Sequence, residues 1–139
     1  MNNSSRFTVA VHILTLLALE ERPLSSTHMA GSVNTNPVVI RRILGMLSKA
    51  GLVTTQLGTD GGSSLAVAAA KITLLDVYRV TERGDLFNLH HNQPNQMCPC
   101  GRNIQPILSQ VFDHAQNAME TALAETTIAQ VAQKIEAQL

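Results

Sequence analysis

Residues 36–51 most limit how this chain folds, because they hold a complete set of signals for one amphipathic helix. Asn36 is a strong N-cap residue, Pro37 suits the first helical position, and Gly51 follows the expected end near Ala50. At about 100° per residue, the aliphatic side chains fall on one face; they are Ile40, Ile43, Leu44 and Leu47. This face predicts a helix packed on a core.

The opposite face of the predicted helix is cationic. It carries three cations and no acid, and its members are Val38, Arg41, Arg42, Gly45 and Lys49. A helix face that is merely solvated usually mixes both signs of charge, so this face favours an anionic partner. The whole chain has no net charge, but residues 1–85 have two more basic than acidic residues, and residues 86–139 have two more acidic ones. An anionic partner is therefore expected at the N-terminal part.

Two further helices are predicted before this one. Residues 6–20 form the first, capped by Ser4 or Ser5, and the segment from Ser25 to about Ser32 forms the second. A turn at residues 33–35 then leads into the cationic helix. The chain has no Trp, one Tyr and three Phe, so its core must be aliphatic, which suits packed helices. Two helices joined by a short turn, the second with an outward cationic face, are typical of a helix-turn-helix.

A β-hairpin is predicted next. Residues 52–57 are rich in β-branched side chains, the Gly-rich tip covers residues 58–63, and a second strand follows over 64–68. The Gly-rich tip could also indicate a phosphate-binding loop, but it opens no helix and lacks the Lys-Ser/Thr ending, which makes that interpretation poor. Thr73 then caps a helix over about residues 74–83.

A long helix is predicted from near Asn103. Its apolar positions keep spacings of three and four for about 20 residues, or roughly 30 Å of helix; they are Ile104, Ile107, Leu108, Val111, Phe112, Ala115, Ala118, Met119 and Leu123. Pro106 is tolerated because the amides of a first helical turn have no partner within the helix. A compact domain of this size cannot cover the whole stripe, so a second copy is the natural partner; packing on the chain's own first helix is the alternative. A last helix follows Thr126 or Thr127.

Three stretches match one family in order and spacing, namely RRILGMLSKAGLV (41–53), GTDGG followed by SLAV (58–67), and KITLLDVYRV (71–80). They resemble the bacterial winged-helix transcription regulators that include IscR, NsrR and CymR, and most closely the YwnA-like members, which lack an iron–sulfur cluster. The likeness continues through NLHHNQPNQMCPCGRNIQ (88–105), which resembles the loop and start of the family's dimerisation helix.

The resemblance implies a mainly α fold: a winged helix-turn-helix with a short β-hairpin wing, over residues 1–84, followed by a sensor loop and dimerisation helices over 85–139. It implies a homodimer that places the third helix in the DNA major groove and the wing in the minor groove. Arg suits bidentate contact with guanine, and Val38 can meet a thymine methyl. The DNA-binding candidates are Asn34, Thr35, Asn36, Val38, Arg41, Arg42, Lys49, Thr59, Gly61, Gly62 and Ser63. The alternative is that Arg41 and Arg42 are ordinary solvated charges.

The wing departs from the family pattern. Many members have an Arg before the first wing glycine and an aromatic residue after the glycine pair, where this chain has Leu57 and Ser63. Asp60 adds a negative charge, which is unfavourable beside phosphates, and a wing without Arg loses its attraction to a narrow minor groove. Gly61 and Gly62 still permit close approach. A weaker or differently targeted wing is therefore expected.

The two cysteines, Cys98 and Cys100, are predicted to be reduced thiols of a cytoplasmic protein rather than a disulfide framework. Cluster-binding members of the family use three cysteines spaced by about six, and the two earlier positions here are Leu86 and Asn92. An iron–sulfur cluster needs enough thiolates, so we expect no cluster and no other cofactor.

A redox role is one interpretation of this pair. A thiol directly before a helix N-terminus reacts readily, so oxidation or a mixed disulfide with a small thiol is expected to alter the dimer and its DNA fit. Half-buried thiols with no sensing task are the alternative. A zinc or soft-metal site is a third and weaker interpretation of these cysteines, because C-x-C with distant histidines is a poor metal-binding signature. The ligands of such a site would be Cys98, Cys100, His90, His91 and His114.

Three functions remain for comparison. The leading one is a sequence-specific DNA-binding regulator, expected to be a repressor that binds a near-palindromic operator as a homodimer. An enzyme is disfavoured, because no set of nucleophile, base and orienting group can be named. An interaction module with the same fold and no base readout is kept open by the altered wing. No signal peptide is expected in residues 6–19, because His12 interrupts the apolar run, and no membrane association is expected.

Overall fold

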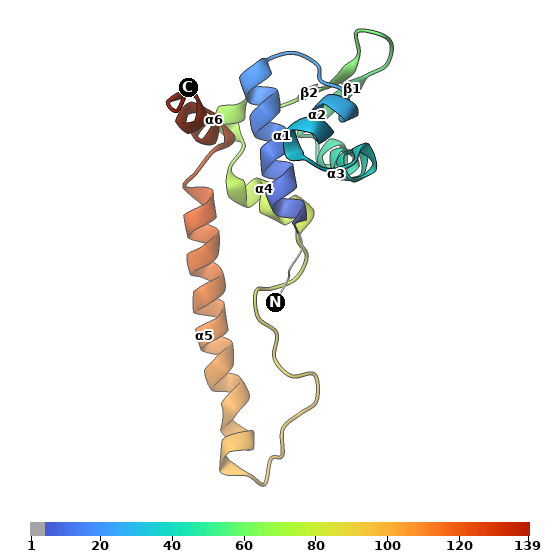
Figure 1. Ribbon diagram of the computed structural model, residues 1–139. Helices are drawn as coiled ribbons and strands as arrows, with labels where there is room; N and C mark the ends of the chain where they lie inside the picture. Colours follow the sequence, from blue (N-terminus) through green and yellow to red (C-terminus); the bar gives the residue numbers. More distant parts are fainter. Residues whose placement is uncertain (1–4) are drawn as a thin grey trace. The chain divides into compact units, whose positions relative to one another are not determined.

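The computed structural model describes residues 5–139, so the predicted cap at Ser4 lies outside the described residues. The chain is mainly helical with one antiparallel hairpin, which confirms the predicted fold class (Figure 1). The elements are α1 (Arg6–Glu20), α2 (Ser26–Val33), α3 (Pro37–Lys49), β1 (Val53–Gln56), β2 (Gly62–Leu65), the 3₁₀-helix η1 (Ala69–Lys71), α4 (Leu74–Thr81), α5 (Pro99–Ala124) and α6 (Ile128–Glu136).

The chain forms two compact units. Residues 5–83 and 123–139 make the first, and Gly84–Ala122 make the second. In the first unit α1 packs against α2, α3, α4 and α6, so it lies at the centre of the helical layer. Its core is aliphatic, as the scarcity of aromatic residues predicts, and its largest fully buried aliphatic side chains are Ile13, Leu14, Leu24, Met29, Ile40, Ile43, Leu47, Ile72, Val77 and Ile128. Burial of this apolar surface is the main driving force for the fold.

Helices α2, α4 and α6 of the first unit each begin after a residue whose side chain caps the helix N-terminus. The hydroxyl of Ser25 accepts from the amide of His28, and the Thr73 and Thr127 side chains each form a capping box with the residue three positions on. At α1 the prediction of a serine cap is wrong for Ser5, which stands at the N-cap but makes no side-chain capping bond. Helix α4 also ends at Thr81, two residues earlier than predicted.

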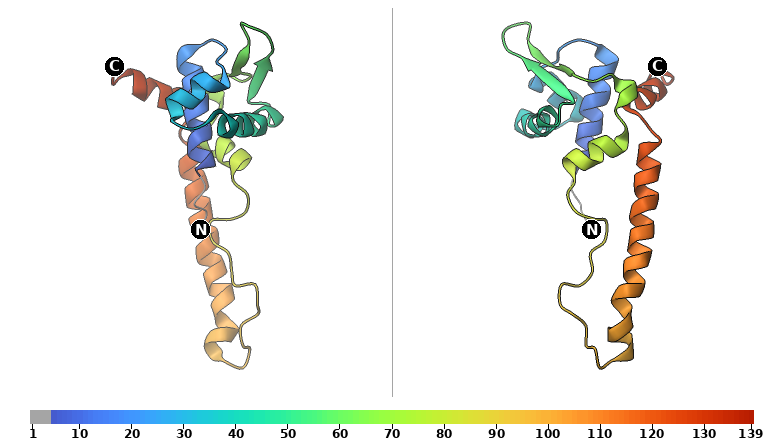
Figure 2. Two further views of the ribbon diagram at one scale, coloured as in Figure 1. Left: turned by 45° about the vertical axis from the view of Figure 1, so that its right-hand side comes forward. Right: turned by 180° about the vertical axis from the view of Figure 1, so that it is seen from behind.

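The hairpin lies beside α3, and its strands have different bounds from those predicted (Figure 2). Strand β2 begins at Gly62 rather than residue 64, and Gln56 pairs with Gly62. The tip therefore covers residues 57–61. The reason is an isolated β-bridge outside the two strands: the amide of Leu24 donates to the Ser63 carbonyl at 3.0 Å, and the Ser63 amide donates to the Leu24 carbonyl at 2.9 Å. These bonds recruit Gly62 and Ser63 into the strand.

In the second unit, the loop after α4 is fastened to α5. The Leu86 amide donates to the Gln116 side chain at 2.9 Å, and the Phe87 and Phe112 rings lie 5.2 Å apart. Helix α5 begins at Pro99, four residues before the predicted start, because proline suits a first helical position. Pro106 therefore lies inside the helix, not in its first turn as predicted. None of the helices in residues 5–139 combines the length and apolar character needed to span a lipid bilayer.

Candidate nucleic-acid interface

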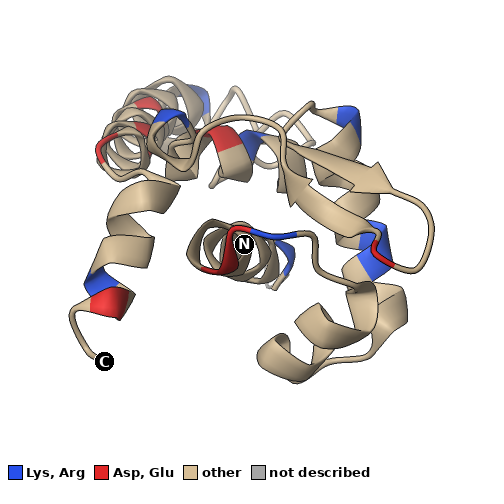
Figure 3. Cartoon of the chain, turned by 90° about the horizontal axis from the view of Figure 1, so that it is seen from above, with Lys and Arg blue, Asp and Glu red and all other residues tan. Residues whose placement is uncertain are grey.

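Helix α3 separates its apolar and cationic sides as the periodicity predicts. Ile40, Ile43 and Leu47 are buried, whereas Arg41 and Arg42 are exposed. The other members of the predicted cationic face are exposed too: Val38, which is 54% exposed, Gly45 and Lys49. The outer side therefore presents cations together with one apolar side chain. Figure 3 marks the Lys and Arg positions of the chain in blue and the Asp and Glu positions in red.

The start of α3 is shaped by its own backbone bonds. Asn34 adopts the left-handed conformation with φ 65°, and the Asn34 and Thr35 amides both donate to the Ala30 carbonyl, which makes the turn between α2 and α3 tight. Asn36 Oδ1 accepts from the amides of Val38 at 2.9 Å and Val39 at 3.1 Å. Asn36 is therefore the N-cap of α3, and its side-chain oxygen is engaged in the fold.

The cations of α3 form no ion pair within the described residues 5–139. Within residues 5–139, Arg41, Arg42 and Lys49 have no carboxylate within ion-pair distance. The paired acids lie elsewhere: Glu82 contacts Arg6, and the Glu20 carboxylate contacts Arg22 and His28. The hydrogen bond from the His28 side chain, supported by the charges of His28 and Arg22, lowers the pKa of Glu20 below its ordinary value. The positive charge on the outer side of α3 is therefore not neutralised by a carboxylate of residues 5–139.

The wing candidates do not share one surface. Thr59 is exposed at the tip, Gly61 and Gly62 are half-buried, and Ser63 is buried in β2 with a Thr55 hydroxyl 3.3 Å from its own. Ser63 therefore does not face outward with the others, because the pairing with Leu24 turns it inward. No local signal in the sequence indicates that pairing, because Leu24 and Ser63 are far apart along the chain.

The two thiols lie at the start of α5. Cys98 directly precedes the helix and Cys100 is in its first turn, and both are exposed. The Cys98 carbonyl accepts from the Arg102 amide at 2.8 Å, as an N-cap carbonyl does, while the Cys98 amide donates to Asn95 at 3.2 Å. Gly101 lets the Asn95 carbonyl approach closely, because a Cβ there would overlap it. The thiols are therefore presented on a closely packed turn.

Comparison with known proteins gives the family. The model described as "Rrf2: Iron-dependent Transcriptional regulator" matches residues 3–134. The chain belongs to the Rrf2 family. A relative named as HTH-type transcriptional regulator YwnA, from Bacillus subtilis (strain 168), is 45% identical over 129 residues, which cover 92% of this chain and 95% of that protein. This protein is accordingly a DNA-binding transcriptional regulator with a winged-helix fold, as predicted.

Solved structures agree with this assignment. One described as a DNA-binding protein is 41% identical, with a TM-score of 0.73, and the match covers 91% of this chain and 98% of that one. CymR, the global cysteine regulator of B. subtilis, has a TM-score of 0.77 at 22% identity, covering 96% and 98% of the two chains. The second likeness shows the fold alone.

The iron in the family description does not fit the residues of this Rrf2 member. Among the described residues, no group of three or more His, Cys, Asp or Glu side chains is placed to hold a metal ion. Cys98 and Cys100 are the two cysteines of the sequence, and an iron–sulfur cluster needs about four protein ligands, so this pair would require two more, which no group among the described residues supplies. The rings of His90 and His91 lie 4.8 Å apart but join no such group.

Proposed function

We propose that this Rrf2 regulator is a repressor that binds a near-palindromic operator as a homodimer, with α3 of each protomer in a major groove. The observation that carries the proposal is the outer side of α3, where three exposed cations face away from the core with no acid among them. Residues 1–84 are assigned DNA binding, and residues 85–139 are assigned sensing and dimerisation. The proposed DNA contacts are Asn34, Thr35, Asn36, Val38, Arg41, Arg42, Lys49, Thr59, Gly61 and Gly62.

Base reading by Arg42 is tested by Arg42→Ala. If the guanidinium reads a base, the substitution weakens specific binding by about 1–3 kcal/mol and relaxes selectivity at one position of each half-site of the operator. Arg83→Ala is the matched control, since Arg83 is an exposed arginine of the same unit outside α3. The measurement is competition binding against fragments selected from total genomic DNA. Unchanged selectivity of the Arg42 variant would remove this residue from the site.

The same assay separates a regulator from an interaction module that lacks base readout. A DNA-reading dimer loses affinity steeply as salt rises, and one genomic sequence outcompetes bulk DNA. A chain that binds all DNA equally weakly at physiological salt would fit the interaction module instead. The proposed activity needs no enzymatic step.

The homodimer is supported by the exposed apolar stripe of α5. Ile107 is 60% exposed and Val111, one turn later, is 56% exposed, and none of the residues of α5 is buried. Exposed aliphatic side chains one turn apart are typical of a helix–helix interface. Val111→Glu is expected to give a monomer in sedimentation, because it places a charge in that stripe. Asn117→Glu adds the same charge on the opposite side of α5 and leaves the dimer intact; equal effects would contradict this interface.

We also propose that Cys98 and Cys100 make DNA binding responsive to thiol oxidation. A thiolate attacks one oxygen of hydrogen peroxide, giving a sulfenic acid and hydroxide, and a small thiol then condenses with the sulfenic acid to a mixed disulfide and water. Exposure of both sulfurs permits this chemistry. Cys98→Ser is expected to abolish the response to peroxide and to leave the affinity of the reduced protein unchanged. A Cys98→Ser protein that still responds would contradict the assignment, and Cys100→Ser is the companion variant. The proposed location is the cytoplasm.

A further inference from the structure

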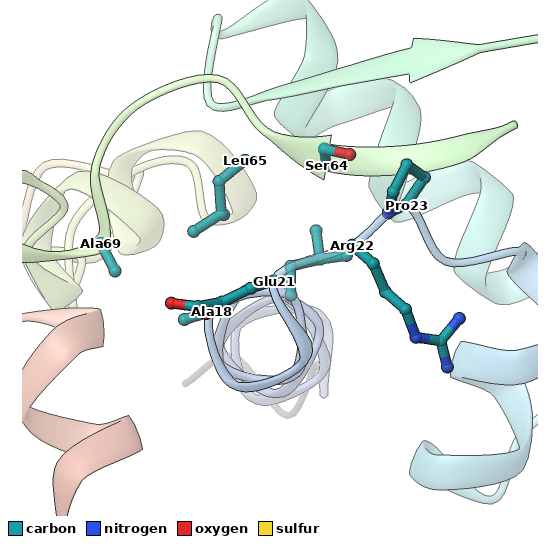
Figure 4. A pocket seen from close by; sticks show the side chains of 8 residues that line it. Ala18, Glu21, Arg22, Pro23, Ser64, Leu65 and Ala69 are labelled. Carbon is teal, nitrogen blue, oxygen red and sulfur yellow. The ribbon is translucent and has the colours of Figure 1, made fainter.

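The wing is attached to the rest of its unit at Gly62 and Ser63, directly beside its tip, so the direction of the tip is determined by the fold. The Leu24–Ser63 bonds attach β2 to the connection between α1 and α2, and Figure 4 shows Pro23 of that connection beside Ser64. Gly62 has φ +144°, and a Cβ there would lie 2.6 Å from the Leu24 carbonyl oxygen, so the two backbones touch. A tip held in this way is preorganised for contact.

The wing cannot use charge to bind DNA. Between Val53 and Leu65 it contains no Lys or Arg, and its one ionisable residue is Asp60, which is exposed. The minor groove is electronegative, most of all where it is narrow, and it attracts cations. An electrostatic wing contact would therefore be repulsive in this protein.

The tip instead presents one large apolar side chain. Leu57, the first residue after β1, is 96% exposed and precedes Gly58, whose φ is +109°. A single exposed Leu is common on protein surfaces, so exposure alone decides nothing. The position of Leu57 relative to α3 is more informative. The amide of Leu52, one residue before β1, donates to the Leu47 carbonyl of α3 at 2.9 Å, so the hairpin starts directly from the helix proposed to enter the major groove.

We propose that Leu57 is a specificity-determining residue, which places an apolar side chain in the minor groove beside each half-site. The proposal rests on the proposed operator binding and deepens it. Apolar side chains in a minor groove act as wedges at base steps, and the cost of unstacking depends on the step. Pyrimidine–purine steps such as TA and CA deform most easily. The wing therefore selects flanking steps by their deformability, through a contact that does not depend on salt.

The test uses the tightest fragment that the wild-type chain selects from total genomic DNA. Leu57→Ala is expected to lower the affinity for DNA about tenfold, because the variant no longer buries a leucine side chain on binding. The loss is expected to be equal at low and high salt, because burial of apolar surface involves no charge. It is also expected to abolish discrimination between a TA step and a stiff A-tract in the flank. A 2-aminopurine at the flanking step brightens when wild-type protein binds and stays dark with Leu57→Ala.

Two further variants sharpen the result. Leu57→Arg replaces the wedge by a cation, so it is expected to steepen the salt dependence while the step preference is still lost. Thr54→Ala changes an exposed residue of β1 away from the tip and is expected to bind as the wild type does. Thermal unfolding should be unaffected in all three, since both positions are exposed.

Two outcomes overturn the proposal while leaving operator binding intact. One is a Leu57→Ala affinity within twofold of wild type, and the other is a loss that shrinks as salt rises, which would mark an electrostatic effect. If the wild-type chain selects no fragment at all, the operator proposal fails and this inference fails with it. The two failures are therefore distinguishable in one experiment.

Discussion

Two substitutions of Asn36 distinguish its effect on the stability of α3 from its effect on DNA binding. Its Oδ1 accepts from two amides at the start of α3, those of Val38 and Val39. Asn36→Ala removes both bonds, and loss of an N-cap costs about 1 kcal/mol. In a chain of this length that lowers the melting temperature by about 4 °C. Asn36→Asp keeps the cap, because aspartate caps as well as asparagine and its charge suits a helix N-terminus.

The aspartate variant should nevertheless bind DNA poorly. Its charge lies at the end of α3 that approaches the phosphates in the proposed complex. Two unit charges about 4 Å apart interact with about 1 kcal/mol in bulk water and about 4 kcal/mol at an effective dielectric constant near 20. Asn36→Asp is therefore expected to weaken operator binding at least about fivefold while it melts like the wild type.

The pair of variants is measured by thermal unfolding and by operator titration at one salt concentration. The two variants are expected to rank in opposite orders in the two measurements. Asn36→Ala should have the lower melting temperature, yet it should bind the operator more tightly than Asn36→Asp when both are compared well below their melting temperatures. An aspartate variant that melts as early as the alanine variant would refute the capping argument. One that binds the operator as the wild type does would show that the start of α3 stays away from phosphate.

Four further substitutions test the fold. Ile43→Ala empties a buried position and should lower the free energy of unfolding by about 2–5 kcal/mol in urea titration. Gly62→Ala forces a Cβ against a backbone at positive φ and should cost about 1–3 kcal/mol, whereas Gly45→Ala, in open space within a helix, should stabilise the chain by up to about 1 kcal/mol. The His28 contact lowers the pKa of Glu20 below its ordinary value of 4.5, so the ionised carboxylate stabilises the fold fully above pH 4.5. This contribution to the free energy of unfolding is lost as the pH falls through the lowered pKa of the folded state. His28→Gln should move the pKa of Glu20 back towards 4.5, as measured by NMR titration.

Sequence reasoning placed elements well where the signals are local. The start of α3 follows from Asn36 and Pro37, and the starts of α4 and α6 follow from Thr73 and Thr127, because a cap acts within one turn. The start of α5 was placed too late for a related reason. Residues 98–101 read as a loop of Cys, Pro and Gly, and Pro99 gives a start signal that is visible only once Cys98 is seen as the N-cap position.

The hairpin shows why the rest could not be predicted. Gly62 has a positive φ, which sequence rules assign to turns, yet it pairs with Gln56 inside a sheet. It does so because Leu24, almost 40 residues away, supplies a partner for Ser63. A pairing between distant segments leaves no periodic trace in either one. The same pairing removes Ser63 from the outer surface, which the residue type alone does not reveal.

The separation of charge between α3 and the wing leads to one quantitative test of the whole interface. Each α3 has three exposed cations, Arg41, Arg42 and Lys49, so a dimer offers six, and the wings offer none. Each phosphate neutralised on duplex DNA contributes about −0.9 to the slope of log affinity against log salt, which bounds the slope from these helices near −5. Arg42→Ala should make the slope shallower by about 2, one contact per protomer. A wild-type slope much steeper than −5 would mean that cations outside α3, such as Arg22 or Lys71, contact the backbone, and the interface would then have to extend beyond this helix.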